Sequence, residues 1–147
     1  MTNSGLIYEG FLRSSREFPQ RPALEVANRV VSYSDLRERA FQLAATRYEL
    51  SDQPPLAAVF GYRSATAFAG MLTALLRGLG YVPLNRTHPP EGAKFMLERS
   101  GCRALLVDEF SAAQLASVLE SLSNKLLILV PDPCPPHCNP IGSLAHG

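Results

Sequence analysis

The sequence predicts an α/β fold with a largely parallel sheet and helices on both faces. Four short apolar runs occur in the middle and later parts of the chain, and three segments with helical spacing separate them. These segments have the length of the crossover helices that join neighbouring parallel strands. The runs are nearly continuous in apolar residues, which is typical of strands covered on both faces. Such a sheet needs helices on each side, so the fold class follows.

The N-terminal part of the chain predicts a helix followed by a β-hairpin. The helix is expected to end at Pro19, because proline cannot continue it. Its predicted apolar face consists of Ile7, Phe11 and Phe18. Two β-prone runs, Ala23–Val26 and Val30–Ser32, then flank Asn28. Asparagine tolerates the left-handed conformation that a tight turn needs, so a hairpin is predicted here.

A second helix is predicted directly after the hairpin. Ser32 can cap it through its hydroxyl group, and Asp35 stands three positions later. This spacing is similar to that of a capping box. The apolar stripe of the helix consists of Leu36, Ala40, Leu43 and Ala44.

The clearest strand–helix–strand pattern lies in the middle of the chain. Leu56–Phe60 is a continuous apolar run, and Ser64 can cap the helix that follows it. The predicted stripe of this helix consists of Phe68, Met71, Leu72, Leu75, Leu76 and Leu79. Gly78 or Gly80 supplies the positive φ that ends it. Tyr81–Leu84 is the next predicted strand.

Two more helices are predicted beyond this point. Pro90 suits the first turn of a helix that closes at Gly101. Ser111 and Gln114 have the spacing of another capping box. The helix after them has a stripe that consists of Leu115, Val118, Leu119 and Leu122. The strands on either side of this last helix are Ala104–Val107 and Leu126–Val130.

The chain of 147 residues is expected to form one domain, followed by a C-terminal tail whose composition differs from that of the domain. Residues 1–130 are predicted to be a partial α/β subdomain, and residues 131–147 a proline-rich, irregular tail. The tail carries five of the twelve prolines and has no periodic apolar pattern. Proline removes backbone donors and blocks both helix and central strand.

Composition and charge argue against several classes of protein. The net charge is +1, and the Lys and Arg residues are scattered, so no binding to nucleic acid or to an anionic membrane is expected. No apolar run approaches the ~18 residues that span a bilayer. Glu9 interrupts the first apolar residues, and no basic residue precedes them, which argues against a secretory signal. Three cysteines, with Cys102 before an apolar strand, favour free thiols and a cytoplasmic protein over a disulfide framework.

Residue chemistry alone predicts no nucleotide site. Phosphate binding needs glycines between a strand and the following helix, where backbone N–H groups face the ligand. Gly78 and Gly80 lie instead between a helix and the following strand. The two lysines, Lys94 and Lys125, stand outside any Gly, Ser or Thr-rich loop and are predicted to be solvated.

Cysteine and histidine leave two alternatives open. The tail residues that could ligate zinc are Cys134, His137, Cys138 and His146. Because no second paired knuckle accompanies them, an irregular tail that happens to hold them is favoured. His88 precedes two prolines and is interpreted as a turn residue rather than a catalytic base. No catalytic, cofactor-binding or metal-ligating residue is therefore predicted.

Two motifs occur in an informative order. VSYSDL, at residues 31–36, is similar to an S/T-Y-x-E-L element. LLRGLGYVPLN, followed by HPPE, is similar to L-K-A-G-x-A-Y-V-P-L-D followed by Y-P-x-E-R. Together they resemble the opening part of the adenylate-forming, AMP-binding enzymes, in particular the amino-acid adenylation domains of peptide synthetases. The resemblance covers about residues 5–130 and includes the spacing between the motifs.

The chain departs from the family pattern at several positions. Asn85 stands where the family usually has Asp, and Gly92 where it usually has Arg. Leu76 and Arg77 replace the usual Lys-Ala pair. Glycine inside a helix costs up to ~1 kcal/mol relative to alanine. These changes suggest relaxed constraint on the sequence.

The resemblance implies an incomplete N-terminal subdomain of an ATP-dependent ligase. In the family, a carboxylate and ATP give an acyl-adenylate, and the acyl group then passes to a carrier thiol. ATP and Mg²⁺ are held by motifs that come after the matched part, so no functional residue is carried over and this chain alone is expected to be inactive. The remainder of an adenylation domain or a carrier protein is the expected partner. The alternative, from another class, is a non-catalytic interaction module that associates through an exposed sheet edge.

Overall fold

A computed structural model describes residues 6–26, 28–46, 55–120, 122–123, 125–131 and 142–145. The elements in chain order are α1 (Glu9–Glu17), β1 (Pro22–Val26), β2 (Arg29–Ser32), α2 (Tyr33–Ala44), β3 (Leu56–Phe60), α3 (Ala65–Leu76), β4 (Gly80–Leu84), α4 (Pro90–Ser100), β5 (Ala104–Val107), a 3-10 turn η1 (Ala112–Gln114), α5 (Leu115–Leu119), β6 (Leu127–Val130) and β7 (Gly142–Ala145).

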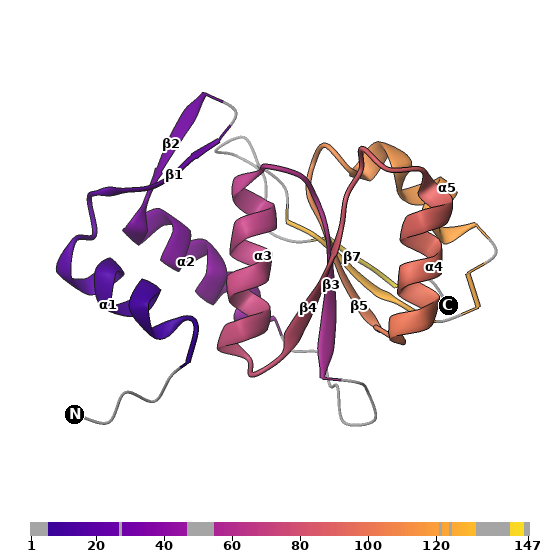
Figure 1. Ribbon diagram of the computed structural model, residues 1–147, viewed down its shortest axis with the longest axis horizontal. Helices are drawn as coiled ribbons and strands as arrows, with labels where there is room; N and C mark the ends of the chain where they lie inside the picture. The colour runs from indigo at the N-terminus through magenta and orange to yellow at the C-terminus, as the bar shows by residue number, and fades with distance from the viewer. Residues whose placement is uncertain are drawn as a thin grey trace.

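The main sheet has the strand order β4-β3-β5-β6-β7. β4, β3, β5 and β6 run parallel to one another, whereas β7 is antiparallel to β6. Figure 1 shows α3 against one face of the sheet and α4 and α5 against the other, with α1, α2 and the β1–β2 hairpin beyond α3. The predicted α/β class, with helices on both faces, is confirmed.

β7 lies within the segment for which the sequence predicts an irregular tail. Its four residues follow the last proline of the chain, Pro140, so each of them keeps a backbone N–H group. Those groups can pair with the open side of β6, and the structure shows that pairing. The prediction of an irregular tail therefore needs correction for residues 142–145. Residues 132–141 lie outside the described part.

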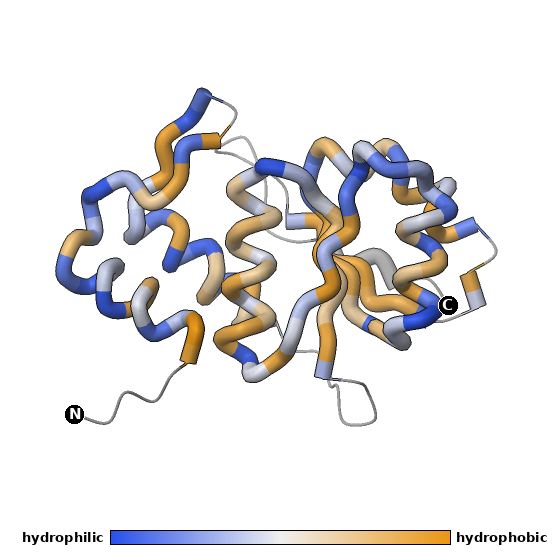
Figure 2. Tube along the Cα trace, viewed as in Figure 1, coloured by the Kyte–Doolittle hydropathy of each residue, from blue (hydrophilic) through white to orange (hydrophobic). Residues whose placement is uncertain are grey.

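Two apolar clusters hold the layers together. Between the sheet and the α4–α5 layer, Phe60, Leu97 and Val118 are almost fully buried. On the opposite face, Val59 and Leu106 pack with side chains of α2 and α3. Figure 2 shows the same pattern, with apolar strands at the centre and polar residues on the outer faces of the helices.

α3 is most deeply buried on a face of small residues, and the predicted stripe of large residues is only half-buried. The buried residues are Thr66, Ala67, Ala69, Gly70, Thr73 and Ala74. At Gly70 a Cβ atom would lie 2.5 Å from Cδ2 of Leu106, so the glycine lets the helix approach the sheet. On the α2 side, the Thr73 hydroxyl lies 3.1 Å from the carbonyl oxygen of Ala40 and donates to it. α3 is packed between the sheet and α2. Its most buried face therefore consists of small residues, which let both layers come close to the helix.

The hairpin and the start of α2 confirm the prediction. β1 and β2 pair antiparallel, and Asn28 has a φ of 59°. Ser32 caps α2, because its Oγ accepts a hydrogen bond of 3.1 Å from the backbone N–H of Asp35. Leu36, Ala40 and Leu43 of the predicted stripe are buried, and Ala44 is half-buried.

The apolar face predicted for the first helix is wrong at both ends. α1 begins only at Glu9, so Ile7 precedes it and is 83% exposed. Phe18 follows the last helical residue, and the Arg21 guanidinium lies 4.3 Å from the centre of its ring. Phe11 alone of the three packs against the apolar cluster next to α3.

Glycine and proline mark the ends of α3 and α4. Gly78, with a φ of 73°, follows α3, and Gly101, with a φ of 67°, caps α4. Gly80 instead begins β4, so Gly78 is the helix terminator of the two candidates. Pro90 occupies the first turn of α4, as predicted.

Replacing Gly92 with alanine is expected to raise the free energy of unfolding by up to ~1 kcal/mol. Gly92 lies in α4, and a Cβ atom there would meet nothing within 4 Å. Alanine loses less backbone entropy on folding, and no contact opposes the gain. Urea denaturation measures the change. Gly101→Ala, at a positive φ next to the same helix, is the control and is expected to destabilise. A loss of stability for Gly92→Ala would contradict the prediction.

Candidate functional site

A ligand site in this fold is expected at the carboxyl ends of the parallel strands. In open α/β sheets, ligands bind outside these ends, at the point where the connections diverge. Here β3 and β5 are neighbours. The chain passes from β3 to β4 on one side and from β5 to β6 on the other. The crevice between β3 and β5 is therefore the expected position of a ligand.

Asp108 fills this position. This residue directly follows β5, and its side chain is fully buried. Oδ2 accepts a hydrogen bond of 2.6 Å from the Ser64 hydroxyl and one of 3.1 Å from the backbone N–H of Tyr62. Oδ1 accepts a hydrogen bond of 2.8 Å from the backbone N–H of Ser111. Two backbone amides at this point, those of Tyr62 and Ser111, are thus bonded to Asp108.

Gly61 allows the two strand ends to close over Asp108. A Cβ atom at Gly61 would lie 2.8 Å from Asp108 Oδ2 and 2.9 Å from the Cβ of Ala67. Neither atom can move freely, because one is held by hydrogen bonds and the other belongs to a packed helix. The crevice is closed by protein atoms, and the glycine contributes close packing rather than a phosphate-binding loop.

The capping box predicted at Ser111 and Gln114 is wrong. The Ser111 side chain caps nothing, and the residue opens a 3-10 turn instead of an α-helix. Its backbone N–H is directed to Asp108. The Gln114 side chain reaches back to the β4–α4 loop, where Nε2 donates a hydrogen bond of 2.8 Å to the carbonyl oxygen of Arg86.

Two arginine and two aromatic side chains lie together beside the closed crevice. The Arg86 guanidinium carbon lies 5.8 Å from the centre of the Tyr62 ring and 5.6 Å from that of Phe110. The guanidinium carbon of Arg63 lies 5.2 Å from the same Tyr62 ring. We call these four residues, Tyr62, Arg63, Arg86 and Phe110, the carboxyl-end rim. Cation–π contacts hold the rim together.

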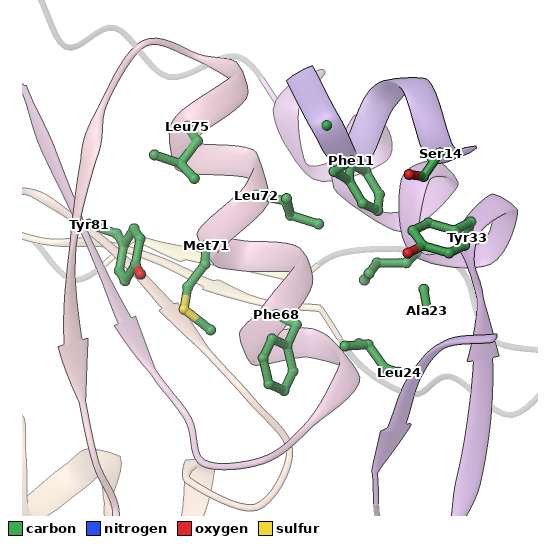
Figure 3. Close-up of a pocket in the computed structure, with 12 residues that line it drawn as sticks. Phe11, Ser14, Ala23, Leu24, Tyr33, Phe68, Met71, Leu72, Leu75 and Tyr81 are labelled. Carbon is green, nitrogen blue, oxygen red and sulfur yellow. The ribbon is translucent and has the colours of Figure 1, made fainter. Parts of the chain in front are cut away.

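A second candidate is an apolar groove of about 480 Å³ beside α3. Figure 3 shows Leu72 of α3 pointing toward Phe11, and Leu75 on the opposite side of the helix, where Tyr81 of β4 lies. Of the predicted α3 stripe, Phe68, Met71, Leu72 and Leu75 line this groove. No charged side chain lines it, so it offers nothing to neutralise a phosphate or a carboxylate.

The lysines, histidine and cysteine named in the sequence analysis lie neither at the crevice nor in the groove beside α3. Lys94 lies on α4, where its Nζ is 4.0 Å from Oε1 of Glu98. Lys125 is exposed before β6, and His88 is exposed in the β4–α4 loop. Cys102 is a buried free thiol, as predicted. The cysteines and histidines of the tail lie outside the described residues.

The described part of the chain holds no group of three or more His, Cys, Asp or Glu side chains that could bind a metal ion. Nor does any helix in it have the length and apolar character needed to cross a membrane.

The comparison with protein families decides the identity. Residues 11–140 match the sequence model of the AMP-binding enzymes. The chain belongs to the AMP-binding enzyme family. Its resemblance to the N-terminal portion of a peptide-synthetase adenylation domain is supported by curated relatives. Tyrocidine synthase 3 of Brevibacillus parabrevis is 34% identical over 108 residues, which are 73% of this chain and 2% of that protein. The synthetase AmbB of Pseudomonas aeruginosa is 31% identical over 116 residues, 78% of this chain and 9% of AmbB.

Solved structures show the same fold for this AMP-binding chain. IdnL7 has a TM-score of 0.66 and 27% identity, and the match covers 86% of this chain and 25% of IdnL7. The Vibrio cholerae adenylation domain AlmE, solved with glycyl-adenosine-5'-phosphate, has a TM-score of 0.71 and 24% identity. That match covers 82% of this chain and 22% of AlmE. The chain therefore spans about a quarter of these structures.

The departure at Asn85 has a local explanation. Its Oδ1 accepts hydrogen bonds of 2.9 Å from the backbone N–H and from the hydroxyl of Thr87. An aspartate oxygen could accept the same two bonds, so asparagine keeps the turn between β4 and α4. The second family motif thus builds a turn in this AMP-binding chain.

Proposed function

We propose that this AMP-binding chain acts as the N-terminal part of an amino-acid adenylation domain and has no adenylating activity alone. The reaction of the complete domain is activation of a carboxylate with ATP and Mg²⁺, followed by transfer to a carrier thiol. The matched relatives support an amino acid as the substrate class, since they are peptide synthetases and an adenylation domain with a glycyl adenylate. We place this reaction in the cytoplasm.

The closed crevice is the observation that carries the proposal of inactivity. Formation of an acyl-adenylate brings two anions together, so cations or backbone N–H groups must stabilise the developing charge. The N–H groups of Tyr62 and Ser111, at the carboxyl ends of the strands, already bond to Asp108. Lys94 is near Glu98 on the outside of α4. In the described part of the chain, the crevice thus has neither a phosphate loop nor a lysine, and the two arginines beside it, Arg63 and Arg86, lie against aromatic rings.

ATP–pyrophosphate exchange tests this proposal. We expect the purified chain to give no exchange above the enzyme-free rate with any of the proteinogenic amino acids or with aryl and fatty acids. The AlmE adenylation domain with glycine serves as the positive control. Exchange that depends on one particular acid would overturn the proposal, since it requires a complete site.

The free edge of β4 favours a second candidate, a non-catalytic interaction module. In the described residues β4 is paired with β3 alone. The N–H of Gly80 and the carbonyl oxygen of Leu84 bond on the β3 side, so the backbone groups of Tyr81 and Pro83 face the open edge. Pro83 has no N–H, which limits uncontrolled strand pairing. A stable monomer or defined dimer in size-exclusion chromatography would favour this candidate, and aggregation would count against it.

A further inference from the structure

We propose that two copies of this chain associate through the outer face of α4, as an antiparallel helix pair related by a two-fold axis at Phe95. In this pair the two Phe95 rings pack on each other, and Glu91 of each copy binds Arg99 of the other. We call Glu91, Phe95 and Arg99 the α4 row. The inference does not rest on the proposed function, because α4 contributes nothing to the crevice.

The α4 row lies on the solvent side of its helix. Ala93 and Leu97 are buried on the opposite side, where they join the apolar cluster of the sheet. Figure 1 shows α4 in the outer layer, on the face of the sheet that is turned away from α3. The three residues of the row are four positions apart, so they follow one another along one helix face, and all three are exposed.

The ring of Phe95 is the most exposed of the phenylalanine rings, at 61%. Each of the other exposed phenylalanines has an arginine over its ring: Phe18 has Arg21, Phe41 has Arg37 and Phe110 has Arg86. Phe95 has neither a cation nor a second ring against it among the described residues. The fold therefore leaves this apolar ring without the cover that it gives to the others.

The two ends of the α4 row carry opposite charges that have no partner within the chain. Of the described residues, neither Glu91 nor Arg99 forms an ion pair, and the ion pair on this helix joins Lys94 to Glu98 instead. Position 91 lies four residues before Phe95, and position 99 lies four residues after it. In an antiparallel pair centred on Phe95, each glutamate therefore faces the arginine of the other copy.

This charge pattern favours one arrangement of one kind of partner. A parallel pair would place Glu91 beside Glu91 and Arg99 beside Arg99, and like charges at such positions are destabilising. A two-fold, antiparallel pair makes both ends attractive, as an isologous interface requires. An anionic membrane or a nucleic acid would repel Glu91, so a second copy fits the α4 row better than either.

The residues beside the α4 row allow the two helices to come close. Gly92 and Met96 form the neighbouring row, which carries no charge. A Cβ atom at Gly92 would meet nothing within 4 Å, and Met96 is 39% exposed. Because α4 has only 11 residues, the interface is small, and specific interfaces below ~1,200 Å² belong to transient complexes. We therefore expect a reversible dimer whose population rises with concentration.

Sedimentation equilibrium of the purified chain over a series of concentrations tests the inference. The native chain is expected to change from monomer to dimer as the concentration rises. Phe95→Gln removes the ring at the centre of the contact and is expected to weaken the dimer at least about tenfold. Phe41→Gln removes an exposed phenylalanine of α2 and is the matched control, expected to leave the dimer unchanged.

Reversal of the charges makes the test specific for the antiparallel pair. Glu91→Arg places two arginines opposite each other at both ends of the contact, and Arg99→Glu places two glutamates there. Each single variant is expected to weaken the dimer about tenfold, and the double variant to regain most of the native affinity. Both changes oppose the helix dipole, so recovery in the double variant cannot come from a more stable helix. Circular dichroism checks that all variants keep the native fold.

Three results would overturn the inference: a chain that stays monomeric at millimolar concentration, a dimer that Phe95→Gln leaves unchanged, or a double variant that dimerises no better than the single ones. The second result would indicate association through another surface, such as the open edge of β4. Exchange activity in the isolated chain would overturn the proposed function alone, because it does not depend on contact between two copies of α4.

Discussion

Asp108→Ala is expected to lower the free energy of unfolding by about 4 kcal/mol, because buried donors that lose their acceptor cost about 1–3 kcal/mol each. The carboxyl group is fully buried and accepts bonds from Ser64, Tyr62 and Ser111. These three residues belong to the two loops that meet at the crevice. Removing the acceptor should therefore also loosen the contact between β3 and β5. Urea denaturation monitored by circular dichroism measures the change.

Two variants serve as controls for Asp108→Ala. Asp108→Asn keeps one oxygen but directs an amide group at a donor, so it is expected to be intermediate between the native chain and Asp108→Ala. Glu109→Ala changes the exposed neighbour and is expected to stay within about 0.5 kcal/mol of the native chain. Equal stability of Asp108→Ala and Glu109→Ala would show that Asp108 does not hold the crevice closed.

Gly61→Ala is expected to lower the free energy of unfolding by about 2 kcal/mol, as for overpacking of a well-packed interior. The added methyl group would meet Asp108 Oδ2 at 2.8 Å and the Ala67 Cβ at 2.9 Å. The loss contrasts with the gain predicted for Gly92→Ala, although the chemical change is the same. Thermal and urea unfolding of Gly61→Ala and Gly92→Ala compare a closely packed glycine position with one that has open space around it.

The double variant of Gly61 and Asp108 tests whether the two residues act together. With alanine at position 108, one of the two clashing groups is absent, so the Gly61→Ala effect should shrink. We expect the combined loss to be smaller than the sum of the single losses. Strict additivity would mean that the glycine is needed for contact with α3 alone.

Local signals made much of the fold predictable. The β-strands follow from continuous apolar runs, and the helix ends from Ser64, Gly78 and Gly101, each of which acts within a few residues of its own position. The stripe of large residues does not predict the buried face of α3, because small residues let the helix approach the sheet more closely. Ala67, Gly70 and Ala74 also have helical spacing, and that pattern of small residues was the available signal.

The crevice and the rim could not be predicted, because they depend on contacts between distant parts of the chain. Asp108 is 46 residues from Tyr62 and 44 from Ser64 in sequence. An aspartate directly after an apolar strand, with a serine three residues later, was the only local sign of its role. The Arg86 stack needs Tyr62 and Phe110 from two other loops, and no spacing in the sequence brings these three together.

Calorimetric titration of the purified chain with Mg·ATP tests the central claim most directly. The claim is that this AMP-binding chain supplies a folded subdomain whose ligand crevice is filled by Asp108. It follows that the chain alone does not bind a triphosphate. The account predicts no saturable heat at millimolar nucleotide, with the AlmE adenylation domain as the binding control. Saturable binding of one ATP per chain would contradict it.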